Sequence, residues 1–287
     1  MASVVSKSAA GGHDWMRIAA AGPRLERVEA FFRGHGFDPH QHDTYAVGFT
    51  VEGVQSFQYR GKAEYCMLGH VFVLHPDERH DGRAGTTTGF RFRTLYVRPT
   101  AIRDTFEDPR RPLPFVRDAV SRNLRIAAAI APALDDLNAP LDDLEIDEIV
   151  LELAHALVEC DRAARSQTLS RYDRRAVNRV RDFLDANIES PVSSTQLERV
   201  SGLTRYAVAR HFRACLGTSP YRYLVLRRLD RACSLIERNI PLADVANLCC
   251  FSDQSHLTRH FKNTFGIPPG RWTKLRTVAR ITTAENE

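Results

Sequence analysis

Four histidines in the first third of the chain are the residues best suited to bind a ligand. His40 and His42 are separated by one residue, and His75 and His80 follow downstream. In an extended segment residues i and i+2 point to one side, so the imidazoles of the first pair face the same way. Imidazoles placed like this can bind a metal ion, form hydrogen bonds to a small molecule, or simply satisfy polar groups in the core. The histidines alone leave these three alternatives open.

A second set of residues with binding chemistry lies in a phrase that the chain uses twice. The segments "RHFRACLGTSPYRY" and "RHFKNTFGIPPGRW" occupy residues 210–223 and 259–272, at a constant offset of 49 residues. Each begins with an arginine, and a guanidinium can bind guanine bidentately or hold a phosphate. The alternative is a surface arginine paired with a carboxylate. Because both copies have arginine at the same position, Arg210 and Arg259, contact with DNA is favoured. Two copies are too few for a solenoid, so the repeat indicates a duplicated small module.

The residues around each copy predict a helix-turn-helix motif. In the first copy, a short helix ends near Gly202, and the next helix is capped by Thr204 and stopped by Gly217. In the second copy, Pro241 suits the first turn of the short helix, and Gly266 stops the longer one. The second helix of such a motif normally enters the major groove of DNA.

One amphipathic helix is predicted between the two motifs, over residues 219–239. Its apolar residues repeat every three or four positions. A helix of about 20 residues is about 30 Å long, and successive major-groove faces of B-DNA lie about 34 Å apart. A rigid connector of this length could present two recognition helices to one face of the duplex.

Length and charge distribution set further limits. The chain has 287 residues, which suggests two domains, and a formal net charge of +5. Residues 1–170 contain 20 lysines and arginines against 24 acidic residues, whereas residues 171–287 contain 20 against 11. The basic C-terminal part suggests a polyanionic partner. We find no apolar run long enough for a membrane helix and no signal-peptide core, so we expect a cytoplasmic protein without membrane contact.

The N-terminal part has the pattern of a β domain. From Tyr45 to Pro99, apolar and polar residues alternate in short runs separated by turn residues. Such runs predict antiparallel strands in a barrel or sandwich, which can enclose one small ligand. We therefore assign residues 1–110 to an effector-binding domain. Arg91 and Arg93 share one strand face there and could neutralise an anionic effector, with an exposed sheet edge as the alternative.

A helical pattern follows over residues 111–165. The helix predicted from Leu141 onward has a broad apolar stripe that must be buried. Packing on the β domain and a dimer seam are the two alternatives. Residues 166–173 suit a linker, and residues 174–280 carry the two helix-turn-helix motifs. The predicted fold class is α+β, with an antiparallel half-barrel, a helical region for packing or dimerisation, and an all-α C-terminal domain.

The doubled phrase resembles the DNA-binding domain of the AraC/XylS family of bacterial transcription regulators. The segment "ADVANLCCFSDQSHLTRHF", which leads into the second copy of the phrase, shares this resemblance. The resemblance implies that seven positions on the two recognition helices read bases. These are Tyr206, Ala209 and Arg210 in the first helix, and Gln254, Ser255, Thr258 and Arg259 in the second. One departure is Cys250, because the family usually has glycine before the phenylalanine of the second turn. Glycine tolerates a left-handed turn better than cysteine does.

The segments "PHQHDTY" and "GHVFVLHPDERH" resemble the two signature regions of the cupin half-barrel that precedes the DNA-binding domain in many members of this family. The candidate effector contacts are His40, His42, Tyr45 and His80. Metal-binding cupins carry a glutamate within a few residues of the histidine pair, whereas here the first acidic residue after Asp43 is Glu52. We therefore expect direct hydrogen bonding to the effector, without a metal ion or other cofactor.

Together these features predict a sequence-specific transcription regulator that binds double-stranded DNA and senses a small molecule through a shift in populations. The family resemblance implies activation through RNA polymerase and assembly into a homodimer. Two alternatives from other classes remain, a metal-dependent cupin enzyme with a DNA-binding appendage and a constitutive architectural DNA binder. The enzyme needs an open metal site and a catalytic acid or base. Because the early glutamate is missing, we expect no enzyme activity.

Overall fold

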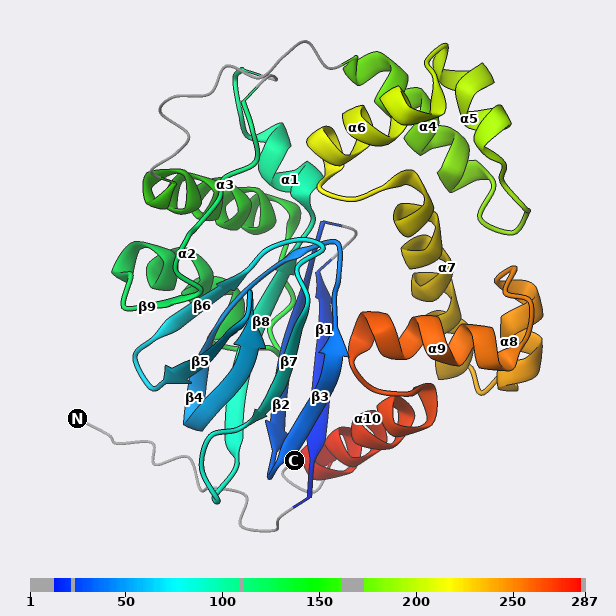
Figure 1. The fold of residues 1–287 in the computed structure, drawn as a ribbon. Coiled ribbons are helices and arrows are strands. Elements are labelled where there is room, and N and C mark those ends of the chain that lie inside the picture. The colour runs from blue at the N-terminus through cyan, green and yellow to red at the C-terminus, as the bar shows by residue number, and fades with distance from the viewer. Residues whose placement is uncertain (1–12, 22–23, 109–110, 162–172, 285–287) are drawn as a thin grey trace.

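The computed structural model describes residues 13–21, 24–108, 111–161 and 173–284, and Figure 1 shows how they are arranged. An antiparallel β structure lies at the centre, with one group of helices on each side. The N-terminal half of the chain forms the strands and the C-terminal part is all helical, which confirms the predicted α+β class.

Nine strands are present in the described residues. They are β1 Trp15–Ala21, β2 Leu25–Phe32, β3 His35–His40, β4 Tyr45–Tyr59, β5 Lys62–Met67, β6 Val71–Leu74, β7 His80–Ala84, β8 Phe90–Val97 and β9 Val120–Ser121. The strands from Tyr45 onward follow the predicted alternation, with the first two predicted runs joined in β4. The sequence pattern does not predict β1 to β3, because alanines in β1 and Gly36 and Pro39 in β3 weaken the strand signal.

The longest strand, β4, belongs to both faces of the half-barrel. Its first part pairs with β6 and β8, whereas its second part pairs with β5 and β7. The main sheet has the order β1-β2-β8-β4-β6-β9, and β3 joins through β7. The register against β8 shifts between Thr50 and Glu52, and Gly53 has a φ of +71°. A bulge beside a left-handed residue bends a strand, so this short stretch turns the sheet onto itself.

Aromatic side chains fill the space between the two faces. They are Phe32, Phe57, Phe72, Phe90 and Phe92, each at most 2% exposed. The ring centroids of Phe90 and Phe92, for example, are 5.5 Å apart. Burial of large aromatic rings is a main source of hydrophobic stabilisation. The same packing leaves little free volume inside the half-barrel.

Arg91 and Arg93 stabilise the sheet and lie at no edge, because β8 is flanked by β2 and β4. Both guanidinium groups pair with the buried carboxylate of Glu29 on β2, at 3.3 and 2.9 Å. An unpaired carboxylate in this position would be costly to bury. The exposed sheet edge that the sequence offered for these arginines is therefore wrong, whereas an effector contact stays a prediction.

The first group of helices covers the outer face of the main sheet. It consists of α1 Pro99–Asp104, α2 Leu124–Leu134 and α3 Asp143–Cys160. The apolar stripe of α3 packs within the chain through Ile146, Ile149, Val150, Leu153, Ala154, Ala156 and Leu157. Most of the stripe therefore packs within the chain, whereas Leu144 at its start stays 78% exposed. The helical pattern predicted from residue 111 onward begins only at Leu124, because β9 precedes α2 and Asn123 caps it.

The second group of helices forms the C-terminal domain. It consists of α4 Arg174–Ala186, α5 Ser194–Ser201, α6 Arg205–Leu216, α7 Pro220–Glu237, α8 Leu242–Leu248, α9 Gln254–Phe265 and α10 Pro269–Ala284. The pairs α5–α6 and α8–α9 are the two predicted helix-turn-helix motifs. As predicted, Thr204 caps α6 and left-handed glycines, Gly217 and Gly266, end α6 and α9. The predicted linker, 166–173, lies outside the described residues except for Asp173, which caps α4.

Two apolar clusters hold the C-terminal domain together. Phe212 of α6 lies in a cluster confined to this domain, with α4 and the start of α7. Phe261 of α9 lies in a cluster that continues into the core of the half-barrel. The second helix-turn-helix motif is thus joined to the β domain by shared apolar packing, whereas the first is packed mainly on its own domain. None of the helices in the described part of the chain is long and apolar enough to cross a membrane.

Candidate functional site

The three reading positions expected on α6 lie on one exposed face of that helix. Tyr206, Ala209 and Arg210 are all exposed, and Tyr206 is 76% accessible. Their spacing of three and four residues places them above one another on a helix. Phe212 points the other way and is fully buried. A phenol, a methyl group and a guanidinium are therefore presented together to a partner.

The four reading positions expected on α9 form an equivalent face. Gln254, Ser255 and Arg259 are exposed, and Thr258 is half-buried. The turn before this helix contains Cys250 in a left-handed conformation, with a φ of +57°. The position where the family usually has glycine thus keeps the glycine-like turn geometry with a cysteine. The second recognition helix is held by the same type of turn as the first, in which Gly202 has a φ of +73°.

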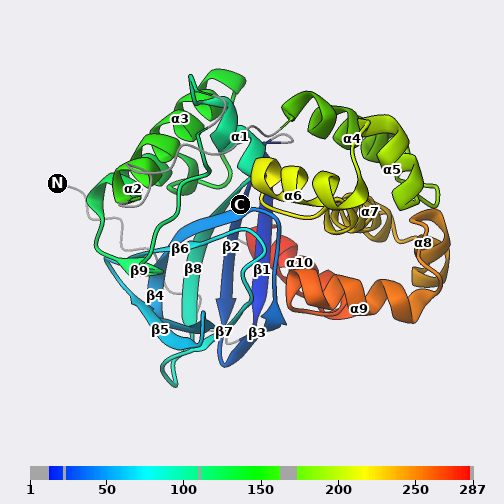
Figure 2. The same cartoon turned by 45° about the horizontal axis from the view of Figure 1, so that its top comes forward.

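The C-terminal ends of both recognition helices contact the β domain, as the arrangement of α6, α9 and the strands in Figure 2 illustrates. A Cβ at Gly217 would lie 3.3 Å from Pro76, and one at Gly266 would lie 2.7 Å from Nδ1 of His40. The reading positions are nearer the other ends of the helices. The β domain therefore touches equivalent points of the two repeats while their reading faces stay exposed.

Replacing Gly266 by alanine should loosen the contact between α9 and β3, because the new Cβ would lie 2.7 Å from Nδ1 of His40 and 2.8 Å from Cβ of Phe37. Gly202 is a matched control, since its φ is similar and a Cβ there would meet no atom within 4 Å. Both variants should lose about 1–2 kcal/mol to the left-handed conformation. Only Gly266→Ala should also accelerate hydrogen exchange of the Asp38 amide, which donates to the Gly266 carbonyl. Equal exchange in both variants would contradict the contact.

A short segment of the β domain, residues 38–43, makes about half of the polar contacts with the C-terminal domain. The Asp38 amide donates to the carbonyl of Gly266 at 2.8 Å, and the Gln41 amide donates to that of Asn263 at 3.0 Å. The Gln41 carbonyl in turn accepts a hydrogen bond from Arg222 of α7. We call residues 38–43 the docking segment.

Charge pairs cross the same interface. They are Asp14–Arg271, Asp38–Lys262, Asp43–Arg227, Asp77–Arg222 and Arg98–Asp230. In the first four pairs the acid belongs to the β domain. The most buried pair joins Asp43 to Arg227 at 2.9 Å, with side chains 11% and 8% exposed. Sequence reasoning missed these residues, and the only signal for them was the acidic N-terminal part beside the basic C-terminal part.

A cavity of about 190 Å³ opens beside this pair, between the two domains. The β domain contributes Asp43 and Arg98 to its wall, and the C-terminal domain contributes Arg181, Asp185 and Arg227. A pocket of this size and polarity suits a small, charged or strongly polar molecule. Any ligand there would contact both domains at once.

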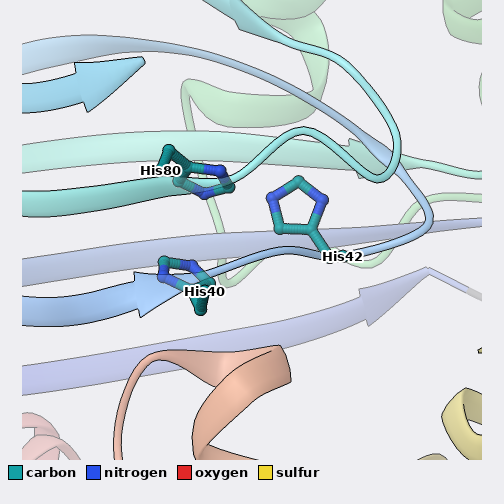
Figure 3. Close-up of side chains that lie close together, drawn as sticks. All are labelled: His40, His42 and His80. Atoms are coloured by element: carbon teal, nitrogen blue, oxygen red, sulfur yellow. The ribbon is translucent and has the colours of Figure 1, made fainter. Parts of the chain in front are cut away.

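Three of the four histidines gather at one end of the half-barrel, as Figure 3 shows. His40 and His80 are direct partners in the β3–β7 ladder, and His42 follows two residues later in the docking segment. The ring centroid of His80 lies 4.3 Å from that of His40 and 4.9 Å from that of His42. One ring nitrogen from each lies within 4.8 Å of one from the others. All three side chains are at most 8% exposed.

Backbone contacts fix the tautomer of each ring. Nδ1 of His40, His42 and His80 donates to the carbonyl oxygens of Asp38, Thr44 and Glu78, at 2.8, 2.9 and 3.0 Å. A carbonyl oxygen only accepts, so every Nδ1 carries the proton and every Nε2 keeps its lone pair. Burial lowers the pKa of all three imidazoles, well below the ordinary value for His40 and His42, and to about 4 for His80. The three rings are therefore neutral at pH 7.

Tyr45, the fourth predicted effector contact, and His75, the fourth of the histidines singled out in the sequence, lie elsewhere. Tyr45 packs in the apolar cluster on the outer face of the sheet, and its hydroxyl donates to the Pro114 carbonyl at 2.9 Å. His75 lies beside Tyr45 and contacts the backbone of Val116 at 3.1 Å. The structure thus brings His40, His42 and His80 together and leaves Tyr45 and His75 out of the group.

The space beside the three histidines is small. A cavity of about 20 Å³ is lined by His40, His80, Gln55 and Thr94, among others. A cavity of this size holds about one water molecule. Gln55 Oε1 and Thr94 Oγ1 are buried there without a hydrogen-bond partner among the described residues. In this arrangement that cavity has room for a water-sized ligand.

Comparisons with known proteins give a consistent result. Residues 22–154 match the model of the AraC-like ligand binding domain, and residues 197–275 match that of a helix-turn-helix domain. The multiple antibiotic resistance protein MarA of Escherichia coli K12 is 32% identical over 97 residues, which make up 33% of this chain and 76% of MarA.

The chain is also similar to the probable transcriptional regulator LumQ of Photobacterium leiognathi, at 26% identity over 158 residues, 53% of this chain and 61% of LumQ. The alignment thus spans less than two thirds of LumQ. The crystal structure of ToxT from Vibrio cholerae with a bound unsaturated fatty acid covers 92% of this chain and 96% of ToxT, with a TM-score of 0.59 and 12% identity. At that identity the likeness concerns the fold.

Proposed function

Because the chain belongs to the AraC/XylS family of transcription regulators, we propose that it binds specific double-stranded DNA sequences and that a small-molecule effector controls this binding. The observation that carries the proposal is the pair of exposed, equivalent faces on α6 and α9. Each face combines a guanidinium with side chains that can contact base edges or phosphates. The basic C-terminal domain supplies the electrostatic attraction for the DNA backbone.

The two faces would read adjacent segments of the major groove. The connecting helix α7 has 18 residues and is therefore about 27 Å long at 1.5 Å per residue. Each recognition helix packs near one end of it. This length is close to the spacing of about 34 Å between successive major-groove faces. A single protein chain would thus act as two readers on one face of the duplex.

Effector binding would act through the interface between the two domains. The cavity of about 190 Å³ is lined by charged residues of both domains, so a ligand there would favour one relative arrangement of them. ToxT, whose fold is similar, has been crystallised with an unsaturated fatty acid. For this chain we propose a small polar or anionic molecule, because the wall includes Arg98, Arg181 and Arg227.

We further propose that the protein works in the cytoplasm, acts as an activator through RNA polymerase, and forms a homodimer. The enzyme alternative gains little support from the geometry. The cavity beside the three histidines is water-sized, and the second recognition helix covers its outer side through Gly266. A substrate would find no room there.

Selection from a random pool of duplex DNA tests the proposal directly. The full-length protein at physiological salt should enrich two short motifs about one helical turn, or roughly 10 base pairs, apart. Enrichment of a single motif would contradict the two-reader account. Binding that is only non-specific and salt-sensitive would contradict sequence-specific regulation by this chain.

Replacing Arg259 by alanine should weaken binding to the selected sequence by about 1–3 kcal/mol and relax one base position, if the guanidinium reads a base. If it holds a phosphate, affinity should fall evenly across sequences and the salt dependence should become shallower. Fluorescence anisotropy over a panel of sequences and salt concentrations separates the two results. Arg125→Ala, which removes an exposed charge from α2, should leave the affinity unchanged. No loss with Arg259→Ala would exclude both roles.

A further inference from the structure

We propose that Arg205, the first residue of α6, reads a guanine in the target DNA, and that Glu198 of α5 is the positioning residue that orients its guanidinium group. This inference rests on the proposed function and extends it, because Arg205 is not one of the reading positions that the family resemblance implies. Arg205 lies at the start of α6, and the N-terminal residues of a recognition helix are the ones that normally contact base edges.

The internal repeat points to this position. The four reading positions expected on α9 have four equivalents on α6 at the constant offset of 49 residues, and these are Arg205, Tyr206, Ala209 and Arg210. Three of them are already expected to read bases, and Arg205 is the fourth. Arg205 and Gln254 each begin their helix, directly after the capping residues Thr204 and Asp253. The two faces are therefore fully equivalent when Arg205 is counted with the first.

Arg205 also supplies the hydrogen-bonding groups that its part of the α6 face otherwise lacks. It is exposed and lies four residues before Ala209, so the two side chains are neighbours on the helix surface. The methyl group of Ala209 offers a base only an apolar contact. The equivalent neighbours on α9, Gln254 and Thr258, carry polar groups at both positions. On α6 a hydrogen bond from this part of the face must therefore come from Arg205.

Glu198 holds Arg205 through two hydrogen bonds to one carboxylate oxygen. Oε1 of Glu198 accepts from the backbone amide of Arg205 at 2.8 Å and from its Nε at 3.2 Å. These bonds engage the inner side of the guanidinium group, whereas Nη1 and Nη2 have no hydrogen-bond partner within the described part of the chain. The side chain of Arg205 is 56% exposed. The outer edge of the guanidinium group therefore keeps its donors free for a partner.

A guanidinium group held in this way suits guanine. The O6 and N7 atoms of guanine are both acceptors in the major groove, and two N–H donors of one arginine bind them together. A side chain that is already fixed loses less rotamer freedom on binding than a free one. Hydrogen bonds from the backbone amide and the guanidinium of Arg205 also hold the pKa of the Glu198 carboxyl below its ordinary value. The ionised carboxylate offsets the charge of Arg205, so the pair contributes base selection more than general attraction to phosphates.

The second motif has no such carboxylate at the equivalent place. Counted back from the left-handed residues of the two turns, Gly202 and Cys250, the position of Glu198 corresponds to Ala246, which is buried. An alanine side chain offers no acceptor, so this position does not hold Gln254. Arginine suits guanine and glutamine suits adenine. The two half-sites should therefore differ at the base that the first residue of each recognition helix contacts.

The reading by Arg205 is tested by selection from a random pool of duplex DNA with full-length wild type and variants. Arg205→Ala should lose about ten-fold in preference for one guanine in one motif and keep the other motif unchanged. Arg205→Lys should lose the same preference, because an ammonium group lacks the planar fork of donors. Arg125→Ala is a matched control, since Arg125 forms another exposed pair with a glutamate, at 3.2 Å from Glu159. If both Arg205 variants keep every base preference of the wild type, Arg205 reads no base.

A double-mutant cycle tests the positioning role of Glu198. Affinity is measured for the selected site and for the same site with adenine in place of the guanine, and the ratio of the two affinities is compared. We expect a ratio of about ten in the wild type, at least about two-fold less in Glu198→Ala, and about one in Arg205→Ala and in the double variant. Glu198→Gln should keep a ratio close to that of the wild type, because its amide oxygen still accepts both hydrogen bonds.

A purely structural role of Glu198 gives a different result. If Glu198 only stabilised the turn between α5 and α6, Glu198→Ala would weaken both affinities equally and leave the ratio unchanged, which would overturn the positioning role. Selection with the wild type separates this inference from the proposed function. If the wild type enriches no motif, the proposed function fails and the reading by Arg205 fails with it. If the wild type enriches two motifs and neither depends on Arg205, only this inference is overturned.

Discussion

Asp43→Ala should release the DNA-binding domain from the β domain. The carboxylate of Asp43 and the guanidinium of Arg227 form the most buried charge pair between the domains, at 2.9 Å. Removing one partner of a buried pair costs about 3–5 kcal/mol, because the remaining charge stays desolvated without compensation. The cost falls on the docked arrangement, since separation of the domains returns Arg227 to water. Undocking is therefore the expected response, rather than unfolding of either domain.

Hydrogen exchange at two backbone amides measures this release. The amides of Asp38 and Gln41 donate to carbonyls of the other domain, so their protection depends on docking. A cost of 3 kcal/mol corresponds to roughly 100-fold faster exchange at these two amides, because each 1.4 kcal/mol is a factor of ten. Amides inside the main sheet should keep their protection. Unchanged exchange at Asp38 and Gln41 would show that the pair does not hold the domains together.

A second acidic partner of the same arginine provides the control. Asp230 also pairs with Arg227, at 3.5 Å, and with Arg98 across the interface, at 3.3 Å, but its side chain is 50% exposed. Exposed pairs contribute only about 0–1 kcal/mol, so Asp230→Asn should leave exchange nearly unchanged. The double variant Asp43→Leu with Arg227→Met should restore much of the docking, because apolar residues often replace a buried ion pair without loss. If the buried charge pair holds the domains together, Asp230→Asn must leave exchange nearly unchanged and the double variant must restore protection.

Phe212→Ala and Phe261→Ala should each destabilise their own part of the molecule by about 3–5 kcal/mol. Both rings are fully buried at equivalent positions of the two repeats. Their surroundings differ, since Phe212 lies in a cluster confined to the DNA-binding domain and Phe261 in one that continues into the half-barrel. Phe212→Ala should therefore lower protection only in α4, α6 and α7. Phe261→Ala should lower it in α9 and α10 and also weaken β1 and β3.

Denaturant unfolding followed by hydrogen exchange measures both effects. Tyr206→Ala is a suitable control, because it removes an aromatic ring from the same helix as Phe212 but from an exposed position. It should leave stability within about 0.5 kcal/mol of the wild type while weakening DNA binding. If Phe261→Ala lowered protection only within the DNA-binding domain, the apolar packing shared by the second motif and the half-barrel would not contribute to stability.

Much of the C-terminal domain could be predicted from the sequence because its signals are local. Capping residues, stop glycines and helical periodicity act within a few positions, so Thr204, Gly217 and Gly266 marked helix ends that the structure confirms. The constant offset between the repeats predicted two equivalent motifs, and the single connector α7 joins them. Which of the exposed side chains read bases remains a prediction from the family resemblance.

The β domain was predicted less completely, because strand pairing joins residues far apart in the chain. The alternation after Tyr45 was visible, but β2 and β3 pair with β8 and β7, which lie 40 to 72 residues away, and β1 joins the sheet through β2. For the same reason the sequence alone could not pair Arg91 and Arg93 with Glu29. It also could not decide that most of the stripe of α3 is buried within the chain.

The sequence by itself determined the family, the two recognition helices and the presence of an HxH pair before a strand. Only the tertiary structure decided that His80 completes a cluster with His40 and His42 and that Tyr45 stays apart from it. It also decided that the docking segment joins this cluster to α7 and α9. The physical reason is that local propensities fix which way a side chain points along its own element. Which element lies opposite depends on burial and charge pairing summed over the whole chain.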